Sequence, residues 1–79
     1  MKSITNSQEL GTAIRTERKR LKVTQKELAM VAGVGLRYLI ELERGKTTAR
    51  IEGVFKVLQA LGLKLSAATP SDGEGIRER

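Results

Sequence analysis

The chain has 79 residues, a formal net charge of +6 and a pI near 10.2, and 39% of its residues are hydrophobic. This length suits one small domain, and the basic excess favours an anionic partner such as nucleic acid. The sequence contains no cysteine or histidine, which excludes disulfides, thiolate or imidazole metal sites, and Ser-His-Asp or Cys-His catalysis. No apolar run approaches the ~20 residues of a membrane span, and no secretory signal opens the chain. We therefore expect a cytoplasmic protein without cofactor or metal.

The first helical pattern follows a short lead over residues 1–6. Ser7 is a suitable N-cap, and apolar residues then recur at helical spacing, which predicts a helix over about residues 8–21. Arg18 lies on the apolar face of this helix, and a buried arginine needs a partner. We predict an ion pair between Arg18 and Glu43 that braces this helix against the third one.

Basic side chains lie on the outer side and at the C-terminal end of the first helix: Arg15, Lys19, Arg20 and Lys22. Cations near a helix C-terminus complement the helix dipole, which is a purely structural role. They could equally contact DNA phosphates, and the sequence leaves both interpretations open.

Two short helical patterns follow, separated by a glycine turn. Thr24 and Glu27 fit a capping box ahead of an apolar residue, and Gly33 closes the first helix. The second helix begins near residues 35–36 and ends at Gly45. Two such helices about a glycine-containing turn form a helix-turn-helix, whose second helix enters the DNA major groove.

The predicted DNA contacts lie at the start of the helix that Thr24 caps, on the helix that begins near residues 35–36, and in the loop after that helix. They are Thr24, Gln25, Lys26, Gly35, Leu36, Arg37, Tyr38, Ile40, Glu41, Arg44, Lys46 and Thr47. Arg37 is the best candidate for reading bases, because a guanidinium binds guanine O6 and N7 together, and its alternative is a phosphate contact. Leu36 beside it suits a thymine methyl.

Three of these residues have a second interpretation. Gln25 is either a DNA contact, which we favour, or only a polar residue at a helix N-terminus. Tyr38 either caps the core or sends its hydroxyl to a phosphate. Glu41 either accepts from cytosine or orients Arg37 across one helical turn, and we favour orientation.

A fourth helix is predicted over about residues 49–61, capped by Thr48 and ended by Gly62. Its apolar residues cover more than one face. The surplus predicts a second contact surface, and Val57 and Leu61 are assigned to a dimer interface there. Alternatively, the helix is central and nearly all buried.

Residues 63–67 alternate apolar and polar side chains, which is typical of a strand. A lone strand needs a partner, either the segment around Ile4 or, more simply, the same strand of a second subunit. The predicted dimerisation residues are Val57, Leu61, Leu63, Lys64, Leu65, Ser66 and Ala67. The chain thus divides into a lead (1–6), a helix-turn-helix domain (7–62), a dimerisation strand (63–68) and a mobile tail (69–79).

The motifs TQKELA, AGV, LIELERGK and VLQALGL, after Leu10, Ile14 and Arg18, resemble the phage-repressor-like helix-turn-helix family of the Cro/C1 or XRE type. The resemblance covers about residues 7–65. It implies a mainly α, four-helix DNA-binding domain and supports the Arg18–Glu43 pair. It also supports the DNA-facing positions Gln25, Lys26, Gly35, Leu36 and Arg37.

The ending FKVLQALGL followed by LKLSAA resembles the HipB-type antitoxins. This resemblance implies a homodimeric repressor whose C-terminal strands pair, which binds a palindromic operator in its own promoter and holds a HipA-type kinase toxin inactive. The alternatives are a stand-alone XRE-family regulator without a toxin, and a protein-interaction module that has lost DNA binding. An enzyme is disfavoured because no nucleophile–base pair is present.

Overall fold

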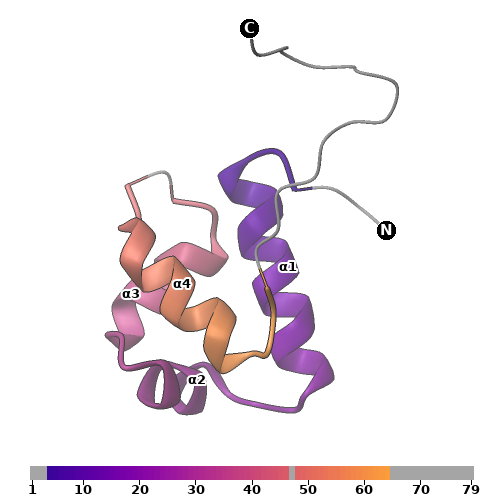
Figure 1. The fold of residues 1–79 in the computed structure, drawn as a ribbon, viewed down its shortest axis with the longest axis vertical. Coiled ribbons are helices and arrows are strands. Elements are labelled where there is room, and N and C mark those ends of the chain that lie inside the picture. Colours follow the sequence, from indigo (N-terminus) through magenta and orange to yellow (C-terminus); the bar gives the residue numbers. More distant parts are fainter. Residues whose placement is uncertain (1–3, 47, 65–79) are drawn as a thin grey trace, which may run out of the picture.

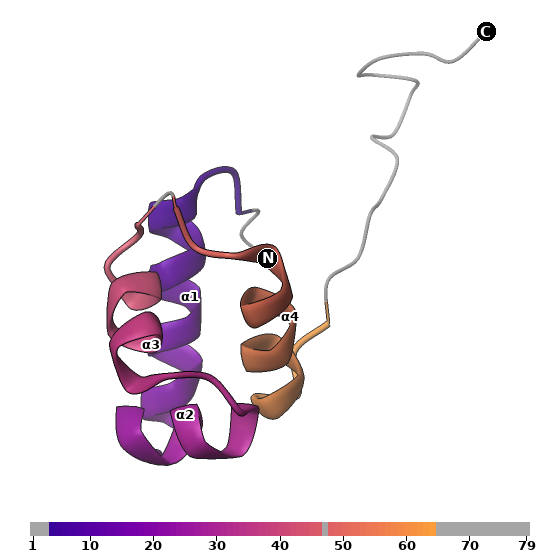
Figure 2. The same cartoon turned by 90° about the vertical axis from the view of Figure 1, so that its left-hand side faces the viewer.

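The computed structural model describes residues 4–46 and 48–64 of the chain. These ranges contain the helices α1 (Ser7–Arg20), α2 (Gln25–Ala32), α3 (Leu36–Glu43) and α4 (Ile51–Ala60). α1 and α3 pack against each other, and α2 lies across one end of the bundle, in contact with α3 and α4 (Figures 1 and 2). The predicted mainly α, four-helix fold is confirmed.

The predicted strand is only partly covered by the described residues. Leu63 and Lys64 follow α4 without forming a strand. The remainder of that segment, Leu65, Ser66 and Ala67, lies outside the described residues, as do Thr47 and the predicted tail.

Local chemistry explains where α1 and α2 begin. The predicted capping box is present at α2, where the Glu27 amide donates to Thr24 Oγ1 (3.0 Å) and the Thr24 amide donates to Glu27 Oε1 (2.9 Å). At α1, the prediction of Ser7 as N-cap is wrong. Asn6 caps the helix by accepting from the Glu9 amide at 2.8 Å, and the Ser7 hydroxyl instead donates to the Gly45 carbonyl at 3.0 Å.

The predicted start of α4 is also wrong. Thr48 does not cap this helix, which begins at Ile51 after an extended Arg50. The chain stays extended there because Ala49 packs against the core and the Arg50 carbonyl accepts a hydrogen bond from the Tyr38 hydroxyl.

The core is aliphatic and brings all four helices together. Its largest fully buried side chains are those of Ile14, Leu39, Leu42 and Val57. Because Val57 is 0% exposed and Leu61 is 6% exposed, the assignment of these two residues to a dimer interface is wrong. Their side chains fill the core of their own chain, since α4 is a central helix.

Candidate nucleic-acid interface

The turn between α2 and α3 fixes the relation of these two helices. Gly33 has φ +75°, a left-handed conformation that glycine adopts at low steric cost. The amides of Gly33 and Val34 both donate to the Ala29 carbonyl, at 2.9 and 3.0 Å, and close the end of α2. Gly35 is extended and precedes α3 without a side-chain cap. α2 and α3 thus form the predicted helix-turn-helix.

A buried polar network fixes the α1-facing side of α3. Arg18 Nε lies 2.7 Å from Glu43 Oε2, Arg18 NH2 lies 3.0 Å from Glu43 Oε1, and NH1 donates to the Val23 carbonyl at 2.8 Å. The side chains of Arg18 and Glu43 are only 10% and 4% exposed, so the predicted ion pair is confirmed as a desolvated, two-pronged contact.

Gln25, at the start of α2, joins the same network. Its amide nitrogen donates to Glu43 Oε1 at 3.0 Å, and the residue is half-buried. One hydrogen of the Gln25 side-chain amide is therefore used in a bond within the protein. This bond ties the N-terminus of α2 to the C-terminal end of α3.

Close backbone packing holds the same end of α3. A Cβ on Gly11 would lie 2.5 Å from the Leu42 carbonyl oxygen and 2.6 Å from that of Glu43, so only glycine lets α1 approach there. Sequence reasoning did not assign Gly11 a role. A glycine inside a helix costs about 1 kcal/mol relative to alanine, and that cost is the signal that could have marked a close contact.

Tyr38 fixes the opposite side of α3 against α4. Its hydroxyl donates to the Arg50 carbonyl, and its ring occupies the space that a side chain on Gly53 would need. Burial raises the pKa of Tyr38 above 10.0, although the charge of nearby Arg50 acts to lower it. Of the two interpretations of Tyr38, the structure shows the one in which it caps the core.

The remaining side of α3 faces outward. Arg37 has a side chain that is 91% exposed, and its Nε lies 3.7 Å from Glu41 Oε2 one turn later. This contact agrees with the interpretation of Glu41 as a residue that orients Arg37. Leu36 is 42% exposed, Arg44 is exposed, and Ile40 is half-buried beside them.

The N-terminus of α2 presents further candidates on its exposed surface. Thr24 and Lys26 are exposed there. The capping box uses the amides of Thr24 and Glu27, so the amides of Gln25 and Lys26 remain for an anion. Lys46 is exposed after α3 and lines a small hollow together with Arg50.

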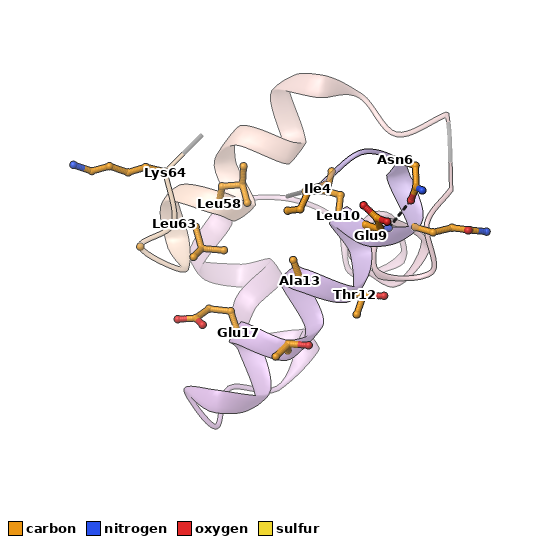
Figure 3. A pocket seen from close by; sticks show the side chains of 13 residues that line it. Ile4, Asn6, Glu9, Leu10, Thr12, Ala13, Glu17, Leu58, Leu63 and Lys64 are labelled. Carbon is orange, nitrogen blue, oxygen red and sulfur yellow. Dashed lines mark hydrogen bonds between the residues drawn. The ribbon is translucent and has the colours of Figure 1, made fainter. Parts of the chain in front are cut away.

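A groove of about 1010 Å³ lies away from this surface, between α1 and the end of α4 (Figure 3). Its apolar lining residues are Ile4, Leu10, Ala13, Leu58 and Leu63. Glu17 and Lys64 also line it. Leu63 and Lys64, the described part of the predicted dimerisation segment, thus share one surface with α1.

No helix in the described ranges is both long and apolar enough to cross a membrane. Over residues 4–46 and 48–64, no group of three or more acidic side chains is arranged to hold a metal ion.

Comparison with known proteins matches this chain to a helix-turn-helix family, to a regulator of that type and to solved structures of HipB complexes. The Helix-turn-helix family matches residues 14–67. The chain is 44% identical over 71 residues to the uncharacterized HTH-type transcriptional regulator y4mF of Sinorhizobium fredii, and the match covers 90% of this chain and 93% of that protein. A HipB–O4 20mer complex and a HipA–HipB–O2–O3 complex each contain a chain of similar structure, with a TM-score of 0.80 and 25% identity over 86% of this chain and 96% of the solved one.

Proposed function

Because this chain belongs to the XRE-type helix-turn-helix family of transcription regulators, we propose that it represses transcription by binding a specific double-stranded DNA sequence. The observation that carries this proposal is the way in which α3 is held. Glu43 ties one of its sides to α1, and Tyr38 ties another to α4. The exposed side with Arg37 is left without packing partners and is suited to enter a major groove.

The contacts divide into base reading and backbone positioning. Arg37 reads a guanine with its guanidinium held by Glu41, and Leu36 meets a thymine methyl. Lys26 and the amides at the start of α2 bind a phosphate. Gln25 contributes chiefly by positioning α2, because its amide nitrogen is already bound to Glu43.

The proposed active form is a homodimer on a palindromic operator in the cytoplasm. A second copy seats on the apolar groove, since Leu63 begins the predicted strand and lines this groove beside α1. Two recognition helices about 34 Å apart would then read half-sites one helical turn apart. The operator is proposed to lie in the promoter of this protein's own gene.

We further propose that the protein is the antitoxin of a toxin–antitoxin pair and holds a HipA-type kinase inactive. The structural similarity to a HipB chain in a HipA–HipB–DNA complex supports this assignment. The alternative is a stand-alone regulator. The 44%-identical relative is an HTH-type transcriptional regulator, a description that fits both assignments. Purification of the tagged protein from its own cells separates the two: a kinase that co-purifies in stoichiometric amount supports the antitoxin, and its absence supports the alternative.

Fluorescence anisotropy with DNA from upstream of the gene tests the repressor proposal. We expect Arg37→Ala to weaken binding to the operator by about 1–3 kcal/mol and to relax the preference at one base pair. Lys56→Ala removes an exposed charge from α4 and serves as the control. An equal loss on every duplex would make Arg37 a phosphate contact, and no binding at low salt would support the protein-interaction module instead.

Sedimentation equilibrium tests the dimer. Ala13→Glu places a charge in the groove without disturbing a core residue, and we expect it to shift the protein to a monomer. Gln59→Glu adds the same charge on the exposed side of α4 and should leave the dimer intact. If both variants sediment as the wild type does, the groove is not the dimer surface.

A further inference from the structure

The polar side chains of α1 are divided between two flanks. Gly11 and Arg18 mark the side that faces α3, because they approach the α3 carbonyls and Glu43. Arg15 follows Gly11 by four residues, and Lys19 follows Arg15 by four, so both lie next to that side. Both are exposed. They therefore form a basic flank of α1 beside the recognition helix.

The other flank of α1 carries the acidic residues. Glu9 and Glu17 both line the groove. Arg20 belongs with them, because its Nε donates to Glu17 Oε1 at 3.0 Å. This hydrogen bond lowers the pKa of Glu17 and raises the pKa of Arg20.

Within residues 4–46 and 48–64, the salt bridges are made by Arg18, Arg20 and Arg37, and none involves the basic flank of α1. Glu43 is nearby, but its side chain is only 4% exposed, and its carboxylate is bonded to Arg18 and Gln25. Arg44, the C-cap of α3, is exposed at the same end. The positive charge of Arg15 and Lys19 thus continues onto the outward side of α3.

We propose that Arg15 and Lys19 bind the phosphate backbone that borders the major groove entered by α3. This proposal rests on the proposed function and assigns α1 a part in it. A major groove is about 12 Å wide and is bordered by phosphates, so an element alongside the recognition helix meets the backbone. Such contacts fix orientation and add affinity, but they carry no sequence information.

The salt dependence of DNA binding tests this assignment. The double variant Arg15→Ala/Lys19→Ala is compared with the wild type by anisotropy on the upstream DNA and on a duplex of unrelated sequence. Each phosphate contact contributes about 0.9 to the slope of log affinity against log salt concentration. Each subunit of the proposed dimer contributes both residues, so the double variant removes four contacts. We therefore expect it to lose about 3.6 from this slope on both duplexes and to keep its ratio of specific to non-specific affinity.

Two further variants control for net charge and for folding. Arg20→Ala/Lys56→Ala removes the same number of charges from other exposed positions and should leave the slope near that of the wild type. Arg15→Lys/Lys19→Arg keeps both charges and should restore it. A wild-type slope in the alanine double variant overturns the assignment of α1 alone, whereas a wild-type protein that binds neither duplex overturns it together with the proposed function.

Discussion

Replacing Glu43 by alanine tests whether the buried ion pair governs the stability of the domain. The change leaves the Arg18 guanidinium, whose side chain is only 10% exposed, without the carboxylate that it contacts at 2.7 and 3.0 Å. Removing one partner of a buried pair costs about 3–5 kcal/mol. A domain of this size has a total stability of about 4–12 kcal/mol, so we expect Glu43→Ala to lose at least about a quarter of that stability, and all of it if the wild type lies at the low end of the range.

Urea unfolding, followed by far-UV circular dichroism at a fixed protein concentration, measures the effect. With a urea slope of about 1 kcal/mol per molar, the midpoint should fall by about 3 M or more. Glu17→Ala, which breaks the exposed pair with Arg20, should leave the midpoint within error of the wild type. The double variant Arg18→Met/Glu43→Leu should recover most of the loss, because it removes both charges. A midpoint for Glu43→Ala equal to that of Glu17→Ala would refute the reasoning.

Three further outcomes follow from local geometry. Gly11→Ala should lower the free energy of unfolding by about 1–3 kcal/mol despite the better helix propensity of alanine, because its Cβ would press on the Leu42 carbonyl. Gly35→Ala has open space around it and should not lower this free energy. Equal urea midpoints for the two variants would contradict the close packing at Gly11. Tyr38, the sole tyrosine, should ionise above pH 10.0 in an absorbance titration of the folded protein and at its ordinary pH in urea, so stability is lost as the pH rises through the folded pKa; ionisation at or below pH 10.0 in the folded protein would contradict its burial. Lys22→Gly should raise the unfolding free energy by up to about 1 kcal/mol, since Lys22 has φ +60°, and a lower urea midpoint would argue against strain there.

Features governed by local chemistry could be predicted from the sequence. The capping box of Thr24 and Glu27 and the turn at Gly33 depend only on neighbouring residues. The Arg18–Glu43 pair was predictable because a guanidinium on an apolar helical face requires a carboxylate wherever the chain can supply one.

Features decided by tertiary contacts could not be read in the same way. Asn6 and Ser7 are equally good N-caps in isolation, and the choice depends on Gly45, whose carbonyl takes the Ser7 hydroxyl. The start of α4 depends on Tyr38 in another helix. Val57 was misassigned because periodicity shows how wide an apolar face is but not how many helices cover it.

The division of α3 between anchored and outward residues has a consequence for the evolution of such proteins. Leu39 and Leu42 are buried, and Tyr38 and Glu43 are bonded to other elements, so these residues hold the helix in place. Arg37 and the other exposed positions take no part in that anchoring. Under the proposed function, exchange of the outward residues would change the DNA sequence that is bound while the scaffold stays the same.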